Sequence, residues 1–184
     1  MTEKYGEERK IRGERIYTGK VIDLERDEVR LSNGESALRE VVRHKGAVAV
    51  VPLCDDGQVL MVRQFRYPHA RSFLEIPAGK LERADEVPLE AAKRELREET
   101  GAVAREMRPI GRYIPSPAIL SEVIHVYLAR GLTFGECDFD EDEFITHERY
   151  PLDELCEMIA RGEIEDGKTQ AAILKVKLLL DREK

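Results

Sequence analysis

Apolar and polar residues alternate in short runs through residues 10–42. A period of two is typical of strands with one buried face, and the Asn33-Gly34 pair favours a tight turn between two of them. Residues 46–53 read GAVAVVPL, an apolar run that is rich in β-branched residues and too short for a helix, which predicts a buried strand. After an Asp-Asp-Gly turn, residues 58–66 are predicted to form a second strand in a hairpin with the first.

Strand patterns continue in the second half of the chain. Residues 104–114 and 122–132 are predicted strands, separated by a loop that contains Pro115 and Pro117. A further short strand is predicted at residues 143–150.

Helical periodicity marks two segments near the end of the chain. Pro151 suits a first turn, and the apolar residues that follow share a stripe that ends at Gly162. Over residues 168–181, four apolar side chains fall on one face: Ala172, Val176, Leu179 and Leu180. Together with a third helix at residues 88–100, these patterns predict an α+β or α/β/α-layered domain.

The helix at residues 88–100 carries a concentration of carboxylates. Its interior consists of strong helix formers, and Gly101 supplies a stop. Glu95, Glu98 and Glu99 lie at i, i+3 and i+4, where like charges destabilise a helix by a few tenths of a kcal/mol per pair. A solvated acidic face is one interpretation of this cluster, and a cation-binding site is the other.

The segment before this helix favours the cation-binding site. It reads EIPAGKLE, an apolar strand end followed by a predicted Pro-Ala-Gly turn, in which Gly79 is expected to adopt backbone angles closed to other residues. A strand, a glycine loop and a helix with convergent glutamates can gather carboxylate oxygens and a loop carbonyl. These are the ligands that magnesium and manganese prefer.

Composition narrows the possible functions. The 184-residue chain is 42% hydrophobic and 36% charged with a net charge of −7, which argues against a nonspecific nucleic-acid binder. No apolar run is long enough to cross a membrane, and the polar N-terminus lacks the apolar centre of a signal peptide. Cys54, Cys137 and Cys156 are far apart without a CxxC motif, so we expect core or partly buried thiols and a cytoplasmic location.

Residues 75–102 resemble the Nudix box, the signature of hydrolases that act on nucleoside diphosphates linked to another moiety. The core RELREETGA matches the family pattern at its fixed places except for Ala102, a small residue at the final aliphatic place. Upstream, one extra residue follows Gly79. The resemblance implies a Nudix-type α/β/α sandwich around a mixed β-sheet, with a β-rich N-terminal extension.

The same resemblance assigns metal ligands. Four groups would bind Mg²⁺, with Mn²⁺ as an alternative: the carbonyl of Ala78 and the carboxylates of Glu95, Glu98 and Glu99. Glu98 is counted among the catalytic residues as well, Arg94 would hold the glutamates in place, and Glu86 would orient the helix or its loop. The cations would neutralise a diphosphate, lower the pKa of an attacking water and relieve the repulsion within the helix.

Segments outside the box resemble the ADP-ribose pyrophosphatase branch of the family. They include HKGAVAVVPL, VRQFRYP, IPSPAILSEVIHVYLA and DGKTQAAI, although Ala118 and Ser121 depart from the branch pattern. The resemblance implies hydrolysis of ADP-ribose to AMP and ribose 5-phosphate by a Nudix domain at residues 45–184. An extension at residues 1–44 would embrace a second subunit in a homodimer. The alternatives are a Nudix hydrolase of a nucleotide sugar or dinucleotide, and a ligand sensor without catalysis, which the complete set of box carboxylates disfavours.

Candidate substrate contacts also come from the branch resemblance. Arg63 and Arg66 stand at odd spacing on one predicted strand, so their side chains point to opposite faces or straddle a strand end. Arg66 is the better candidate for the diphosphate because a guanidinium matches phosphate oxygens, and a surface ion pair is the alternative. Glu75 and Arg43 complete the candidate substrate-binding residues, with Arg43 placed near the base.

The acidic run CDFDEDEF holds the candidate general bases. In the resembling branch a glutamate of this loop activates the water, and Glu143, ahead of Glu141, is our candidate for that role. A solvated acidic loop is the alternative interpretation. Lys168 and Thr169 match a branch motif at the start of the last helix, where helix capping is an equally good interpretation.

Overall fold

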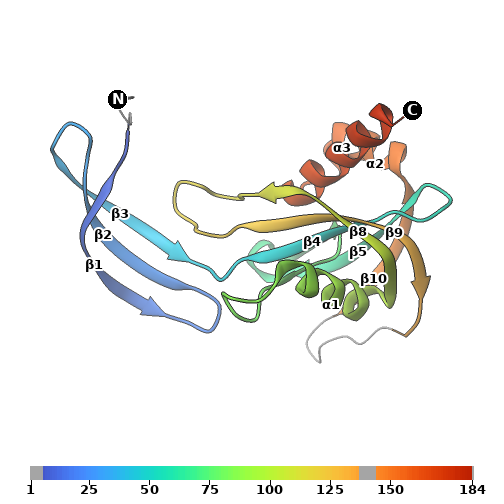
Figure 1. Ribbon diagram of the computed structural model, residues 1–184, viewed down its shortest axis with the longest axis horizontal. Coiled ribbons are helices and arrows are strands. Elements are labelled where there is room, and N and C mark those ends of the chain that lie inside the picture. The colour runs from blue at the N-terminus through green and yellow to red at the C-terminus, as the bar shows by residue number, and fades with distance from the viewer. Residues whose placement is uncertain (1–5, 137–143, 184) are drawn as a thin grey trace.

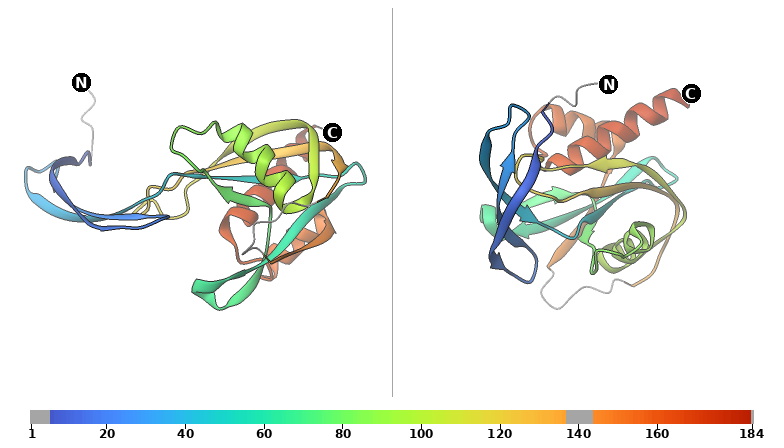
Figure 2. Two further views of the ribbon diagram at one scale, coloured as in Figure 1. Left: turned by 90° about the horizontal axis from the view of Figure 1, so that it is seen from below. Right: turned by 60° about the vertical axis from the view of Figure 1, so that its left-hand side comes forward.

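A computed structural model describes residues 6–136 and 144–183 of the chain. The N-terminal part of the described chain is a three-stranded antiparallel arm that extends away from a layered body (Figure 1, Figure 2). The arm consists of β1 (Arg9–Thr18), β2 (Asp23–Arg30) and β3 (Ser36–Arg43). The predicted turn between β2 and β3 is confirmed, since Gly34 has a φ of 89° and its N–H donates to the Leu31 carbonyl.

Within the described residues, two sheets form the body. The first is a four-stranded mixed sheet with β4 and β9 parallel, in the order β7 (Ala78–Lys80), β4 (Ala47–Pro52), β9 (Ile124–Phe134) and β8 (Ala102–Tyr113). The second is antiparallel, in the order β10 (Ile145–Pro151), β5 (Gln58–Arg66) and β6 (Arg71–Glu75), with the short 3-10 helix η1 (Tyr67–His69) between β5 and β6. The strands lie where the sequence pattern predicts them, apart from two. Only the end of β6 was predicted, and β7 occupies the segment predicted as a turn.

The predicted hairpin between β4 and β5 is wrong. All six residues of β4 are buried, and its two edges bond to β7 and β9, so no edge is left for β5. A bridge between Leu53 and Val59 closes the turn, and the chain then crosses to the other sheet. The turn signal is therefore correct, but the partners of β4 are set by its burial on both faces.

In the described part of the chain, three α-helices cover the body from both sides (Figure 1). One core joins α1 (Pro88–Thr100) to Val48 and Val50 of β4. The other core joins α2 (Leu152–Ala160) and α3 (Gly167–Arg182) to Ala49 and Val51 of the same strand. Alternate residues of β4 thus supply both cores, as expected for a strand buried on both faces. The predicted α+β class with α/β/α layers is confirmed.

The ends of the helices follow local signals. Val87 precedes α1 without a side-chain cap, and Gly101 ends it with a φ of 66°, as predicted. Asp166 precedes α3 and accepts a hydrogen bond from the Thr169 N–H at 3.0 Å. None of the helices formed by the described residues is long and apolar enough to span a membrane.

Candidate active site

A cavity of about 1190 Å³ is lined by the arm's end, both sheets of the body, α1 and the start of α3. Five of the predicted site residues line it: Arg66, Glu75, Ala78, Glu95 and Glu98. Ligand pockets in proteins measure roughly 300–1,000 Å³, so a nucleotide derivative has room here. The tertiary structure thus brings three of the four predicted metal ligands and the predicted diphosphate contact to one cavity, while Glu99 is not among the residues that line it.

β7 brings the backbone of Gly79 against the Glu95 side chain of α1. A Cβ atom at position 79 would stand 1.9 Å from the Glu95 Cδ, so only glycine fits while that carboxylate keeps its place. Gly79 lies in a strand and is not among the glycines with a left-handed backbone, which corrects the predicted turn. The glycine is required by a close approach and not by its backbone angles.

Arg94 links the carboxylates on the cavity side of α1. Its Nη1 donates to Glu95 Oε1 at 2.8 Å and to Glu98 Oε2 at 2.9 Å. Its Nη2 lies 3.5 Å from Glu86 Oε1, and Glu86 Oε2 accepts from the Glu82 N–H at 2.7 Å in the loop before the helix. Burial would lower the pKa of Arg94, but the adjacent carboxylates raise it above its ordinary value. The arginine therefore stays charged between the two glutamates.

Glu99 is buried in the last turn of α1, with 2% of its surface exposed. Its Oε2 accepts a hydrogen bond from the Ala78 N–H at 3.0 Å, which ties α1 to β7. The predicted ligands are hard oxygen donors, which fit Mg²⁺ or Mn²⁺ in their chemistry. Among the described residues, however, no three acidic, histidine or cysteine groups meet closely enough to hold an ion, and Arg94 holds Glu95 and Glu98. The guanidinium bonds to one oxygen of each of these two carboxylates.

A buried carboxylate organises another wall of the cavity. Glu75, at the end of β6, is 2% exposed and accepts two hydrogen bonds from Arg66, Nε to Oε1 and Nη2 to Oε2, both at 2.8 Å. Lys168 Nζ also donates to Glu75, and it donates to Asp166 Oδ2 at 2.9 Å. Burial alone would raise the pKa of Glu75, but the contacts with Arg66 and Lys168 lower it to about 2.

The lowered pKa of Glu75 predicts an acid-sensitive contribution to stability. Because its pKa is about 2 in the folded protein against an ordinary 4.5, the ionised group stabilises the native state above pH 4.5, and this contribution is lost as the pH falls toward 2. At about 1.4 kcal/mol per pKa unit, the contribution is roughly 3 kcal/mol. Urea unfolding of wild type and Glu75→Gln should give free energies that differ most near neutral pH and converge in acid. A difference that does not depend on pH would contradict this assignment.

Arg63 and Arg43, two predicted substrate contacts, do not line this cavity. Arg66 lines it, so Arg63 lies on the other face of β5, where its Nε donates to Glu148 Oε1 at 2.5 Å. Opposite faces of the strand were one of the two placements that the sequence left open for Arg63 and Arg66. Arg43 ends β3 of the arm, with its Nε 2.9 Å from Glu25 Oε2. A substrate role for either residue stays a prediction.

Lys168 and Asp166 are cavity residues that sequence reasoning did not select for the site. Asp166 caps α3 and holds the Lys168 ammonium, which then reaches Glu75. The motif DGKTQAAI was the available signal. Residues of this motif both cap α3 and line the cavity. A role in helix capping and a role in the site are therefore compatible.

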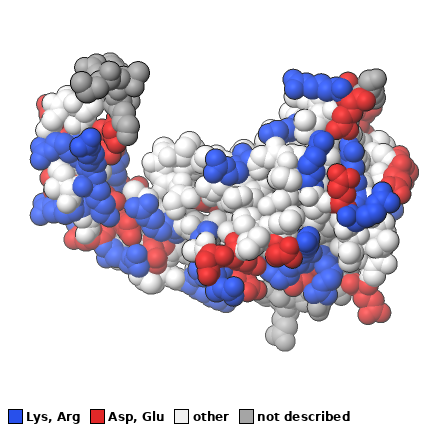
Figure 3. Space-filling view, in the orientation of Figure 1, with Lys and Arg blue, Asp and Glu red and all other residues white. Residues whose placement is uncertain are grey.

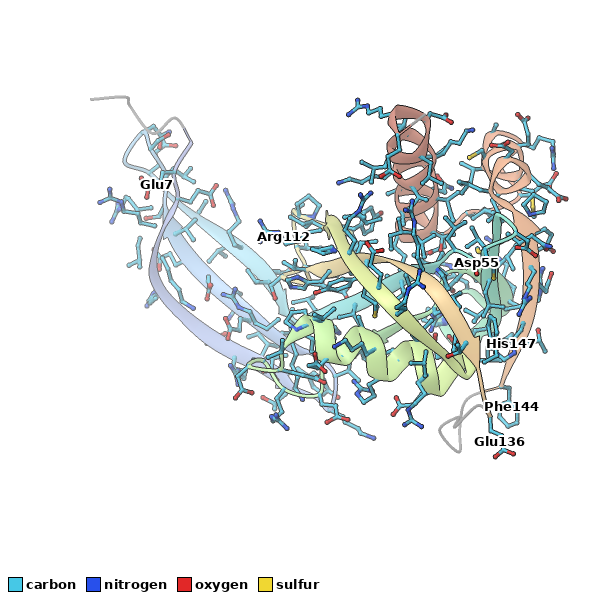
Figure 4. All side chains as sticks on the ribbon, turned by 45° about the vertical axis from the view of Figure 1, so that its right-hand side comes forward. Glu7, Asp55, Arg112, Glu136, Phe144 and His147 are labelled. Atoms are coloured by element: carbon cyan, nitrogen blue, oxygen red, sulfur yellow. The ribbon has the colours of Figure 1, made fainter. Side chains whose placement is uncertain are left out.

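The candidate general bases, Glu141 and Glu143, lie outside the described residues. The chain on both sides is anchored beside the C-terminal end of α1. The Gly135 N–H donates at 2.8 Å to a carbonyl just past that end, and His147 Nε2 contacts the Glu99 carbonyl at 2.6 Å (Figure 4). The chain therefore leaves and re-enters the described part next to the helix that carries the predicted metal ligands.

Comparisons with known proteins find relatives of this chain in sequence and in fold. The NUDIX domain matches residues 43–172. The chain is 43% identical to an ADP-ribose pyrophosphatase of Bacillus subtilis (strain 168) over 94% of both chains, and 41% identical to a methanol dehydrogenase activator of Bacillus methanolicus over 95% of both. It is 39% identical to an ADP-ribose pyrophosphatase of Mycobacterium tuberculosis (strain ATCC 25618 / H37Rv), over 90% of this chain and 81% of that one. A crystal structure of an ADP compounds hydrolase matches with a TM-score of 0.86 and 20% identity, over 99% of this chain and 98% of that one, a likeness of fold.

Proposed function

Because this chain belongs to the Nudix family, we propose that it is an enzyme that hydrolyses the pyrophosphate bond of ADP-ribose. The predicted family and Nudix-type fold are confirmed by the domain match and by the likeness in fold to an ADP compounds hydrolase. The observation that carries the proposed substrate is the similarity, over nearly the whole chain, to two ADP-ribose pyrophosphatases. The cavity supports the same conclusion because it brings carboxylates and cations together.

Each part of the cavity has a role in the proposed reaction. Arg66 supplies positive charge for the diphosphate, and α1 supplies the carboxylates. A water oxygen forms a new bond to one phosphorus, the bridging P–O bond breaks, and AMP and ribose 5-phosphate leave. One water proton passes to the general base, for which Glu143 is our first candidate and Glu141 the second. The other proton stays with the new phosphate group or leaves to solvent.

A divalent cation is part of the proposal, with Mg²⁺ first and Mn²⁺ as an alternative. Glu95, Glu98, Glu99 and the carbonyl of Ala78 would hold it, in keeping with the oxygen ligands that such ions prefer. When bound, the cation neutralises diphosphate charge and lowers the pKa of the attacking water. Arg94, which bonds to one oxygen of each carboxylate, would hold Glu95 and Glu98 in place for the cation.

Removal of metal should abolish turnover. In the presence of Mg²⁺, the purified protein should convert ADP-ribose to AMP and ribose 5-phosphate, separated by anion-exchange chromatography, and excess EDTA should stop the reaction because the carboxylates then have no cation to hold. Turnover that survives EDTA would contradict the metal requirement. Assays with a nucleotide sugar and a dinucleotide test whether ADP-ribose is the preferred substrate. A higher kcat/KM for either compound would make that compound the substrate in place of ADP-ribose.

We also propose that the arm forms a homodimer. Large apolar side chains of the arm are between 38% and 65% exposed: Ile11, Ile16, Tyr17, Val21, Ile22 and Leu38. They stand among side chains of both charge signs (Figure 3), and exposed apolar surface of this kind is typical of an interface. Light scattering after size exclusion should give twice the 21.1 kDa chain mass, and Tyr17→Glu combined with Leu38→Glu should shift it toward one chain. A single-chain mass for the wild type would contradict the dimer.

The division between extension and Nudix domain at residue 44 stays a prediction.

A cytoplasmic location remains part of the proposal. Cys54 and Cys156, the cysteines that the described residues include, are unpaired thiols, as is usual in a reducing compartment. Burial raises the pKa of both thiols, which keeps them protonated and weakly reactive.

A further inference from the structure

The Glu75 carboxylate lies between two cations of the cavity wall. Arg66 bonds to both of its oxygens, and Lys168 reaches Oε2 from the first turn of α3. The Glu75 side chain is 3% exposed, whereas the Arg66 and Lys168 side chains are 38% and 12% exposed. A ligand that enters the cavity therefore meets the cations, and the carboxylate stays behind them.

The start of α3 is locked to β6 beside this carboxylate. Asp166 Oδ2 accepts from the Lys168 ammonium at 2.9 Å and from the Thr169 N–H at 3.0 Å. The Thr169 hydroxyl oxygen, which is buried, accepts from the Ile76 N–H at 3.0 Å, directly after Glu75 in the chain. Buried hydrogen bonds therefore fix the distance between the lysine and the carboxylate that it contacts.

Electrostatics make the carboxylate necessary for this arrangement. Two neighbouring cations repel each other unless an anion lies between them, most of all where water is largely excluded. The low pKa of Glu75, about 2, keeps that anion ionised at neutral pH. The pKa of Arg66 is raised first by its hydrogen bonds to Glu75 and further by Glu99, so the guanidinium also lies within electrostatic reach of the glutamate helix.

We propose that Glu75 is a positioning residue that holds Arg66 and Lys168 side by side as a two-cation binding site for the diphosphate of the substrate. This inference rests on the proposed hydrolysis of a nucleoside diphosphate derivative. Lys168 becomes a substrate-binding residue, and Glu75 acts through its two partners, in place of the substrate-binding role that the sequence resemblance suggested for it. The same three side chains define an anion site that the α1 carboxylates do not contribute to.

A pure charge effect and a loss of positioning predict opposite changes in substrate binding for Glu75→Gln. Removing a negative charge beside phosphate-binding cations would strengthen the binding of an anionic substrate by simple Coulomb attraction. Loss of positioning would weaken it, because a neutral amide no longer holds two mutually repelling cations together. We expect KM for ADP-ribose to rise about tenfold or more, with kcat changed by less than about threefold.

Glu183→Gln is the matched control for this experiment. Glu183 is also a carboxylate between two cations, with Arg108 at 3.0 Å and Arg130 at 3.2 Å, but none of the three lines the cavity. The control should leave KM and kcat unchanged. Lys168→Gln is the second variant, because it removes one cation and leaves the Glu75–Arg66 contact intact. It should also raise KM, and the double variant should add little to either single one, as expected for residues that act as a unit.

Each outcome decides the inference. A lower or unchanged KM in Glu75→Gln, measured where circular dichroism shows the variant folded, would overturn it, as would fully additive effects in the double variant. If Glu75→Gln does not fold, Lys168→Gln carries the test, and an unchanged KM there overturns the proposal. Failure of the proposed function would look different from failure of this inference. In that case the wild-type protein itself would not hydrolyse ADP-ribose, whatever the variants do.

Discussion

Glu99→Gln should lower the turnover of ADP-ribose by about 10³-fold or more while the protein keeps its fold. The new amide retains an oxygen that can accept the 3.0 Å hydrogen bond from the Ala78 N–H, so the contact between α1 and β7 is preserved. What disappears is the negative charge on which a divalent cation depends. A bound cation supplies several kcal/mol of charge stabilisation, and each 1.4 kcal/mol of it is about tenfold in rate.

Two measurements check this expectation. Steady-state kinetics at saturating Mg²⁺ report the turnover, and calorimetric titration with Mg²⁺ reports the metal affinity, which should fall together with it. Glu90→Gln is the control, because Glu90 lies on the same helix and pairs with Lys93 at 2.8 Å on the solvent side. Turnover like that of the wild type would remove Glu99 from the metal site. An equal loss in the control would point to the overall charge of the helix.

Gly79→Ala should reduce kcat/KM by about 10²-fold with little loss of stability. The new Cβ would stand 1.9 Å from Glu95 Cδ and 2.2 Å from both carboxylate oxygens. These atoms form the tip of a flexible side chain, so Glu95 can turn away at small cost, and the strand conformation of Gly79 accepts alanine. The substitution thus displaces a predicted metal ligand and leaves the packing of α1 on the sheet in place.

Gly135→Ala separates this effect from the general consequences of adding a methyl group. Among the described residues, a Cβ at position 135 meets nothing closer than 3.8 Å, so both the activity and the melting temperature of this variant should match the wild type. Thermal unfolding and kinetics on both variants give the comparison. A large drop in the melting temperature of Gly79→Ala would show that β7 itself cannot hold a side chain there. Full activity would show that the position of Glu95 does not matter.

Local patterns in the sequence specify most elements of the body and the carboxylate-rich helix α1. Pro88 and Gly101 mark the ends of α1 as observed, and the run RELREETGA assigns the family that the domain match confirms. Helix ends, turns and periodicity depend on residues that are neighbours in the chain, so their physical causes are present in a short window. Family membership follows from a motif that is equally local.

The partners of the strands depend on contacts between distant segments. The Asp-Asp-Gly turn predicts a reversal of the chain after β4, and the reversal occurs, but β5 pairs with β6 and β10 in another sheet. β4 is buried on both faces, so distant segments compete for its edges. Hydrogen bonding to β7 and β9 wins that competition, and no local pattern encodes its result.

The roles of the charged residues were likewise decided by packing. Arg63 and Arg66 share a strand and a residue type, yet one pairs with Glu148 outside the cavity and the other lines it beside Glu75. Lys168 reaches Glu75 across 93 positions of sequence. Whether a charge binds a ligand, positions a neighbour or forms a surface ion pair depends on its burial and on its partners. Both are set by segments that are far apart in the chain and meet only in the folded protein.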